Sequence, residues 1–202
     1  AAAHLGASVF AHHSHLWAQP GSAHAAGTAC DFACLGYGVV CAFGILTSCS
    51  LSLLLLLLQG TNTYLVGQGS SRILVDSGED VTAEAYVPHL ISVMRDTGVV
   101  SLSAILLTHG HHDHQGGVPF LLEKLKKQFP DQRLPVVYKR TIGAGLWDSG
   151  NYPAKGFEAQ HIRDGEEFRT QGATLKAVYT PGHTDDHVAF CLIEDKAILT
   201  GD

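Results

Sequence analysis

Four histidines and one aspartate fall within six consecutive positions of this sequence. They follow the apolar run Ala104–Thr108 directly, in the order His109-Gly110-His111-His112-Asp113-His114. In an extended chain alternate side chains share a face, so His109, His111 and Asp113 can point together before a turn brings His114 round. Imidazole nitrogens and carboxylate oxygens are ligands that zinc takes in proteins. A loop that is polar by chance is the alternative, but this density of ligand types after a buried strand favours a metal site.

Two later segments place further ligand types after predicted strands. Thr174–Tyr179 is followed by the run from Thr180 to His187, which contains His183, and Ala197–Leu199 is followed by Thr200-Gly201-Asp202. Because α/β sheets build their sites where several strand ends meet, we expect His183 and Asp202 to join the histidine segment. An aspartate after glycine would otherwise be an ordinary turn residue.

The elements that must position these side chains alternate between strands and helices. Apolar runs predict strands at Thr63–Val66, Arg72–Val75, Ala104–Thr108, Pro135–Tyr138, Thr174–Tyr179, Val188–Ile193 and Ala197–Leu199, the first two as a hairpin. Helical spacing of apolar residues predicts a helix over Ala83–Asp96 and another after Gly117, and Thr141–Asp164 is expected to be a loop. This order indicates the α/β class with mixed strand pairing.

The first 58 residues have a different character. Residues 1–60 hold a single charged side chain, Asp31, and four of the five cysteines, and Phe32–Leu58 is an uncharged apolar run. The run is long enough to span a bilayer, but no basic residue flanks it to orient such a span. We therefore interpret residues 1–58 as the end of a fragment or a mis-joined coding segment outside the fold, rather than as a membrane anchor, and place the domain at residues 59–202.

These motifs resemble those of the metallo-β-lactamase superfamily. The pattern Thr-His-x-His-x-Asp-His, the Pro-Gly-His-Thr segment and the final Gly-Asp occur in that order. The stretches Gln59–Val66, Gln171–Leu175 and Pro181–His187 are similar to the mitochondrial endoribonuclease branch called β-lactamase-like protein 2. The resemblance implies an αββα sandwich, of which residues 59–202 would form only the N-terminal half to two-thirds, with the second half missing.

The resemblance also implies a role for each motif residue. It implies a first zinc ion on His109, His111 and His183 and a second on Asp113 and His114, with Asp202 bridging the two. Iron and manganese accept the same ligands and remain alternatives to zinc. By the same resemblance Asp76 would orient the site through hydrogen bonds, and Asp113 would be catalytic, orienting a metal-bound hydroxide.

The leading functional prediction is a metal-dependent endoribonuclease acting on single-stranded RNA, because of the branch resemblance. The alternatives are a hydrolase of small thioesters, resembling glyoxalase II or an acyl-carrier thioesterase, and an inactive truncated isoform. The formal charge of −6 weakens the case for a nucleic-acid partner. No membrane partner is expected, and the oligomeric state stays open.

The chain departs from the family's pattern at both ends. The family implies a final histidine for the second metal after Asp202, and an opening strand before Gln59, where the polyleucine run lies. We therefore expect weak stability and little activity from this polypeptide. A single cysteine beyond residue 60, Cys191, excludes an internal disulfide there. The resemblance implies the mitochondrial matrix, with the cytoplasm as the alternative.

Overall fold

The computed structural model describes residues 61–141 and 156–202 with their side chains, and the strand backbone at residues 37–42 and 45–50. All of these residues belong to one compact unit, Phe32–Asp202. The polyleucine run and the N-terminal cysteines Cys30 and Cys34 lie outside the described residues, and so does most of the predicted loop Thr141–Asp164.

A mixed sheet of seven strands forms the centre of the described part. Its order follows the chain: β1 (Tyr37–Ala42), β2 (Ile45–Ser50), β3 (Asn62–Val66), β4 (Ser71–Val75), β5 (Ser101–Leu106), β6 (Val136–Lys139) and β7 (Ala159–His161). Neighbours from β1 to β4 pair antiparallel, and those from β4 to β7 pair parallel. The C-terminal ends of β4, β5 and β6 therefore meet at one edge of this sheet.

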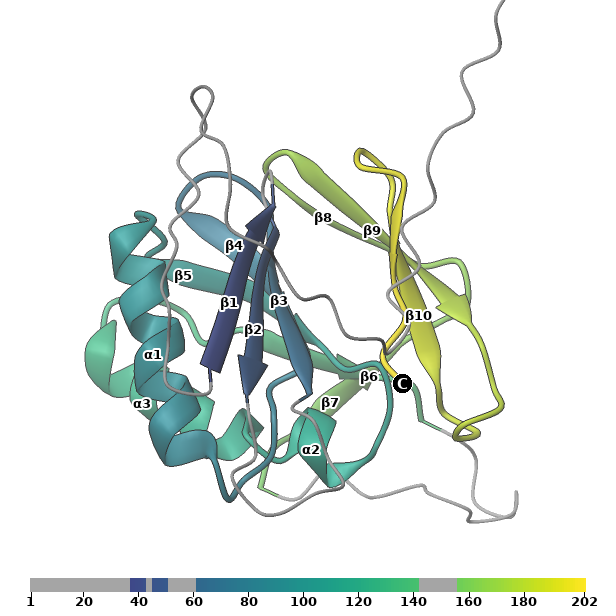
Figure 1. Cartoon of the computed structure of the whole chain (residues 1–202), viewed down its shortest axis with the longest axis horizontal. Coiled ribbons are helices and arrows are strands. Elements are labelled where there is room, and N and C mark those ends of the chain that lie inside the picture. The colour runs from purple at the N-terminus through teal and green to yellow at the C-terminus, as the bar shows by residue number, and fades with distance from the viewer. Residues whose placement is uncertain (1–36, 43–44, 51–60, 142–155) are drawn as a thin grey trace, which may run out of the picture. The chain divides into compact units, whose positions relative to one another are not determined.

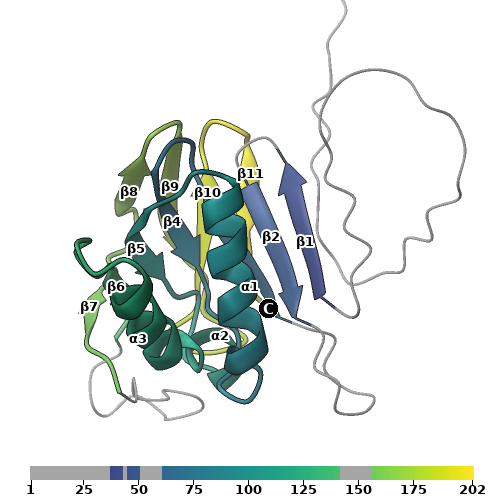
Figure 2. The same cartoon turned by 90° about the vertical axis from the view of Figure 1, so that its left-hand side faces the viewer.

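A second, antiparallel sheet packs on one face of the first. It has the order β11-β10-β9-β8 and contains β8 (Glu167–Thr170), β9 (Ala173–Tyr179), β10 (Val188–Leu192) and β11 (Ala197–Leu199). The opposite face of the first sheet is covered by helices α1 (Ala83–Asp96) and α3 (Val118–Gln128), as Figures 1 and 2 show. The described residues thus form a helix layer and two sheet layers, which confirms the predicted fold class.

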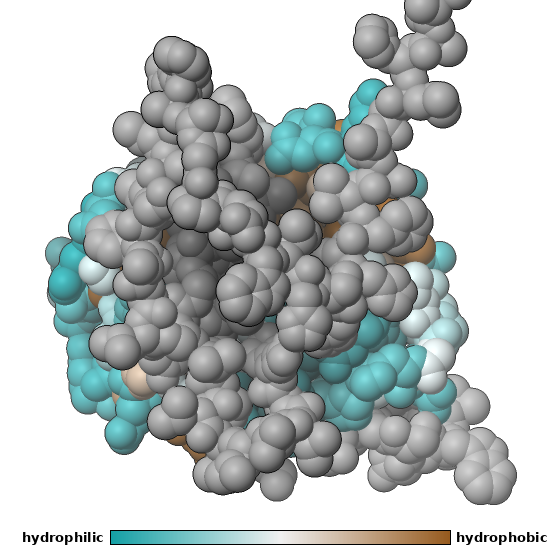
Figure 3. All heavy atoms as spheres, viewed as in Figure 1, coloured by the Kyte–Doolittle hydropathy of each residue, from teal (hydrophilic) through white to brown (hydrophobic). Residues whose placement is uncertain are grey.

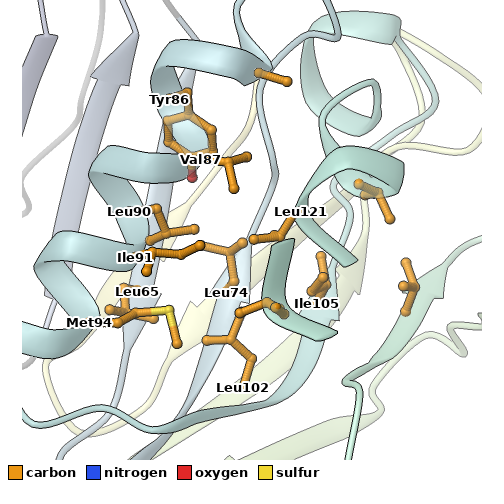
Figure 4. Close-up of a cluster of buried hydrophobic side chains, with 14 of the residues drawn as sticks. Leu65, Leu74, Tyr86, Val87, Leu90, Ile91, Met94, Leu102, Ile105 and Leu121 are labelled. Atoms are coloured by element: carbon orange, nitrogen blue, oxygen red, sulfur yellow. The ribbon is translucent and has the colours of Figure 1, made fainter. Parts of the chain in front are cut away.

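The alternation of side chains along the central strands produces two cores. Leu65 and Leu74 point to α1 and α3, and Figure 4 shows them there with Tyr86, Leu90 and Met94 of α1. The next residues along β3 and β4 point instead to the second sheet, where they pack with others from both sheets, among them Val66, Val75, Leu106, Leu175 and Phe190. Because both faces are buried there, the C-terminal halves of β3 and β4 are runs of consecutive apolar residues, Leu65-Val66 and Ile73-Leu74-Val75.

The predicted helices and strands beyond residue 60 are confirmed, and three elements are added, but the predicted loop Thr141–Asp164 is wrong at residues 159–161, which form β7. Helix α1 has the predicted bounds, and its predicted face of Val87, Leu90, Ile91 and Met94 is buried. The short strands β7 and β8 and the one-turn helix α2 (His112–Gln115) were not predicted. Strand β7 carries Ala-Gln-His with one half-buried and two exposed residues, so it lacks the apolar signal by which buried strands are recognised.

Strands β1 and β2 come from the segment that the sequence analysis placed outside the fold. Their backbones form a hairpin that pairs onto β3, with Ile45 opposite Val66 and Cys49 opposite Asn62. The remainder of residues 1–58 lies outside the described residues, so the domain boundary at residue 58 stays a prediction.

On the face shown in Figure 3, the outer side of the helix layer at the left is coloured as hydrophilic. Within the part of the chain that the structure describes, no helix combines the length and the apolar character needed to cross a bilayer.

Candidate metal centre

Three histidine side chains converge from the two sheets. His109 and His111 follow the end of β5, and His183 lies in the loop that joins β9 to β10. The Nδ1 atom of His111 is 2.9 Å from Nε2 of His109 and 2.9 Å from Nε2 of His183. An Asp202 carboxylate oxygen lies 3.5 Å from Nε2 of His183. One ligand atom from each of these four residues lies within 4.8 Å of the others, so they could hold a single cation.

A second group adjoins the first and shares one member with it. Asp113, His114 and Asp202 also offer ligand atoms within 4.8 Å of one another. Nε2 of His114 is 3.1 Å from Oδ1 of Asp202 and 3.7 Å from Oδ2 of Asp113. The structure therefore brings together all six side chains that the sequence analysis proposed as ligands, in the predicted two sets, with Asp202 in both.

Helix α2 changes the local path by which these side chains meet. His111 is extended, with φ −64° and ψ 147°, but the chain turns into α2 at His112. The expectation that His109, His111 and Asp113 alternate along one extended strand is therefore wrong at its last member, because Asp113 reaches the site from a helical turn. His112, which was not assigned a role, is exposed.

Burial and the neighbouring imidazoles lower the pKa of two histidines of the first group, His109 and His111. Burial lowers the pKa of His109 to about 2, with further lowering by the neighbouring imidazoles of His114 and His111. Burial also lowers the pKa of His111, assisted by His183 and partly opposed by Asp113. Metals bind the neutral form of imidazole, so these rings are already in the binding form at neutral pH.

His114 differs, because it lies among carboxylates. Burial by itself would lower its pKa, but the negative charges of Asp76, Asp202 and Asp113 and the hydrogen bonds to the first two raise the pKa to about 10. The hydrogen bond from His114 in turn lowers the pKa of Asp202. In the metal-free chain His114 is thus a cation between carboxylates, and a metal ion would have to displace its Nε2 proton.

The ring nitrogens of this cluster can all bind one divalent cation, but they cannot all form hydrogen bonds with one another. The Nδ1 atom of His111 faces two imidazole nitrogens at once, although a neutral ring nitrogen either donates one proton or accepts through one lone pair. A cation would accept the lone pairs of all three rings, which protons cannot do together. Three nitrogens with a carboxylate suit zinc, and iron or manganese accept the same donors.

Asp76 lies where an orienting residue should be. It is buried, and it accepts hydrogen bonds at Oδ1 from the Thr108 amide and at Oδ2 from the Thr108 hydroxyl, both 2.9 Å long. Oδ2 also lies 2.8 Å from Nδ1 of His114, leaving Nε2 of that ring to face Asp202. The hydrogen bond fixes which nitrogen points into the site.

Sequence reasoning missed other residues that contact the centre. The hydroxyl of Thr61 donates to Oδ2 of Asp113 at 2.9 Å, and Lys139 forms a buried ion pair with Asp186 beside the histidines. The alternation along the predicted strand Pro135–Tyr138 offered a signal for Lys139, because it shares the buried face of Val137. Thr61 and Asp186 lie in stretches used for the family resemblance but were given no role.

Residues 57–202 match the family model described as "Metallo-beta-lactamase superfamily". A solved metallo-β-lactamase of Cronobacter sakazakii with a HARLDQ motif superimposes with a TM-score of 0.54 at 20% sequence identity, over 77% of this chain and 57% of that one. At this identity the superposition supports the fold alone.

Two similar curated relatives carry thioesterase names. The atrochrysone carboxyl ACP thioesterase of Aspergillus fumigatus is 43% identical over 145 residues, which are 72% of this chain and 30% of the relative. Thioesterase pkgB of Emericella nidulans is 45% identical over 147 residues, or 72% of this chain and 36% of the relative. The chain thus spans about a third of the length of these relatives. Their names support the thioester alternative and give no support to an endoribonuclease or to a mitochondrial location.

Proposed function

Given that the chain belongs to the metallo-β-lactamase superfamily, we propose that it is the metal-binding part of a hydrolase that cleaves acyl thioesters. The observation that carries the proposal is the pair of ligand groups that share Asp202. Two cations held on adjacent groups suit hydrolysis, because they stabilise charge that develops on the attacked oxygen. The thioester class is supported by the names of two relatives, each more than 40% identical to this chain.

The proposed roles follow from the positions of the side chains. His109, His111 and His183 would hold one zinc ion, Asp113 and His114 a second, and Asp202 both. Bound zinc supplies a nucleophile by lowering the pKa of a coordinated water from about 15.7 towards about 7. Asp113 is partly exposed, and Thr61 fixes its Oδ2 atom. Its carboxylate would orient the attacking water and accept a proton from it.

The net reaction adds the elements of water across the carbon–sulfur bond. The acyl carbon gains oxygen and leaves as a carboxylate, while the sulfur leaves as a thiol. Carrier-linked acyl groups are the substrate class named for one relative. RNA is the weaker candidate, because it is a polyanion and this chain carries a formal charge of −6.

The test is a single-turnover assay with the protein in excess, so that slow cleavage still registers. The probes are an acyl-pantetheine thioester, a glutathione thioester and a single-stranded RNA, each with added zinc and with a chelator. Free thiol is measured with a disulfide reagent, and RNA products are resolved on a gel. The matched control is His112→Ala, which removes an exposed histidine of the same segment, against His183→Ala.

We expect zinc-dependent release of thiol from the pantetheine probe, lost in His183→Ala and kept in His112→Ala. The choice between the two thioesters then indicates whether the substrate is carrier-like or glutathione-like. RNA cleavage without thiol release would overturn the proposal in favour of the nuclease prediction. Thiol release that survives the chelator would overturn the role of the metal.

A further inference from the structure

Lys139 and Asp186 form a buried ion pair that the proposed mechanism does not use. Nζ of Lys139 lies 2.6 Å from Oδ2 of Asp186, and both side chains are almost completely shielded from solvent. The other carboxylate oxygen of Asp186 accepts a hydrogen bond from the Thr184 hydroxyl at 2.7 Å. Burying two charges is costly unless the geometry supports them, so such a pair within the fold needs a physical reason.

The pair supports the turn that carries two of the histidines. Gly110 packs directly on it: a methyl group added there would lie 2.9 Å from Oδ2 of Asp186 and 3.1 Å from Nζ of Lys139. The backbone of Gly110 does not have a positive φ, so glycine is required here for space and not for conformation. The position of the ion pair therefore determines how close the His109–His111 turn can come to β6.

The same pair fixes the loop that carries the third histidine. Asp186 and Thr184 lie in the loop between β9 and β10, and the Thr184 carbonyl accepts backbone hydrogen bonds from Gly182 and from His187. His183 lies between Gly182 and Thr184 in the chain, and the Thr184 side chain is buried. Through Asp186 this loop of the second sheet is bound to Lys139 at the end of β6 in the first sheet.

We propose that Lys139 and Asp186 are positioning residues, which hold His183 against the His109–His111 turn before a cation arrives. The inference rests on the proposed metal site, but it concerns the support of that site and not its substrate. In the empty cluster Nδ1 of His111 faces two imidazole nitrogens and can form a hydrogen bond with only one of them, so the scaffold must hold the nitrogens together. Partners of this kind typically change metal affinity by about 10- to 100-fold when they are removed.

The test measures cobalt(II) binding to the full chain by competition with a chromophoric chelator, together with the visible spectrum of the bound cobalt. Lys139→Met removes the charge and retains the length of the side chain. We expect about 10- to 100-fold weaker binding and a shifted cobalt spectrum, because His183 no longer meets the other rings. Asp186→Asn preserves the shape of the carboxylate and replaces Lys139→Met if that variant does not fold.

The matched control is Met94→Ala. Met94 is buried in the core between the first sheet and the helices, where it packs in the same cluster as Leu65 of β3 and Leu102 of β5 (Figure 4). The substitution destabilises the fold without touching the ion pair, so cobalt affinity and spectrum should stay within about twofold of the original chain. Equal losses of affinity in Lys139→Met and Met94→Ala would overturn the positioning role alone. An original chain that binds no cobalt would overturn both proposals. An original chain that binds cobalt but cleaves no thioester would overturn only the proposed function.

Discussion

Replacing Asp76 with asparagine would test how His114 is held, because it removes a buried charge and preserves the shape of the side chain. Asp76 has a φ of 59°, a conformation that asparagine tolerates well, so the backbone need not move. The amide oxygen can still accept the hydrogen bond from the Thr108 backbone. Its NH₂ group would then face Nδ1 of His114, which loses its acceptor. The ring would carry its proton on Nε2, the nitrogen that faces Asp202.

The size of the effect follows from the hydrogen bond that is lost. A buried hydrogen bond to a charged group contributes about 1.5–3 kcal/mol. Since each 1.4 kcal/mol is about a factor of ten in an equilibrium constant, we expect zinc to bind about 10- to 100-fold more weakly to Asp76→Asn. The metal-free protein should lose about 2 kcal/mol of its free energy of unfolding at neutral pH, for the same reason.

The dependence on pH provides an independent check of the sign. The folded-state pKa of His114 is raised to about 10, above the usual value of about 6.5. Its contribution to stability is therefore complete below about pH 6.5 and is lost as the pH rises towards about 10. In Asp76→Asn this loss on the alkaline side should shrink, because the largest favourable charge beside His114 has been removed.

The assay combines urea unfolding of the chelator-treated protein between about pH 6 and about pH 10 with zinc competition at neutral pH. Asp96→Asn, an exposed aspartate on α1, is the matched control and should change neither quantity. If Asp76→Asn bound zinc as tightly as the original chain and kept its alkaline loss of stability, the assignment of Asp76 as the residue that orients His114 would be refuted.

Three further predictions concern the surroundings of the site. Gly110→Ala should lower the free energy of unfolding, measured by urea denaturation, by about 1–3 kcal/mol, because the new methyl group would lie 2.9 Å from Oδ2 of Asp186. Gly182→Ala is the control: its methyl group would enter open space, so the free energy of unfolding should not change. Thr61→Val should reduce the rate of thioester cleavage by about 5- to 10-fold, since the proton-accepting carboxylate loses a hydrogen bond of about 1 kcal/mol; an unchanged single-turnover rate would exclude this role. The lowered pKa of His109, about 2, makes the metal-free fold lose stability as the pH falls below about 6.5, by up to about 1.4 kcal/mol per pH unit; calorimetry should show it, and a flat profile on the acid side would contradict it.

The candidate ligands could be predicted to lie together because their sequence signal is local. Each of them follows an apolar strand within a few positions, although His183 and Asp202 follow strands of the second sheet and meet the other candidate ligands across the two sheets. The path of the chain was less predictable, because the same residues suit an extended strand or a helical turn. At His112 the helical turn is adopted, and the backbone amides of residues 114 and 115 bond to the carbonyl of His111.

The support of the site could not be predicted, because its partners are distant in sequence. Lys139 and Asp186 are 47 residues apart, and Thr61 and Asp113 are 52 residues apart. No spacing rule connects such pairs, so the alternation that places Lys139 on the buried face of Val137 does not identify its partner. The Lys139–Asp186 contact arises only when the second sheet packs on the first, and the Thr61–Asp113 contact joins the start of β3 to α2. Both depend on the tertiary structure and not on a local pattern.

The charges of the cluster indicate which kind of catalysis it can support. A general acid or base works best when its pKa lies near the operating pH. The pKa of His109, about 2, lies far below neutrality, and that of His114, about 10, lies far above it. Neither ring is therefore suited to exchange protons with a substrate at neutral pH. Both are suited to holding a cation. His109 is neutral and can donate a nitrogen lone pair. The carboxylates that raise the pKa of His114 also stabilise a positive charge at its Nε2 atom, whether that charge is a proton or a metal ion.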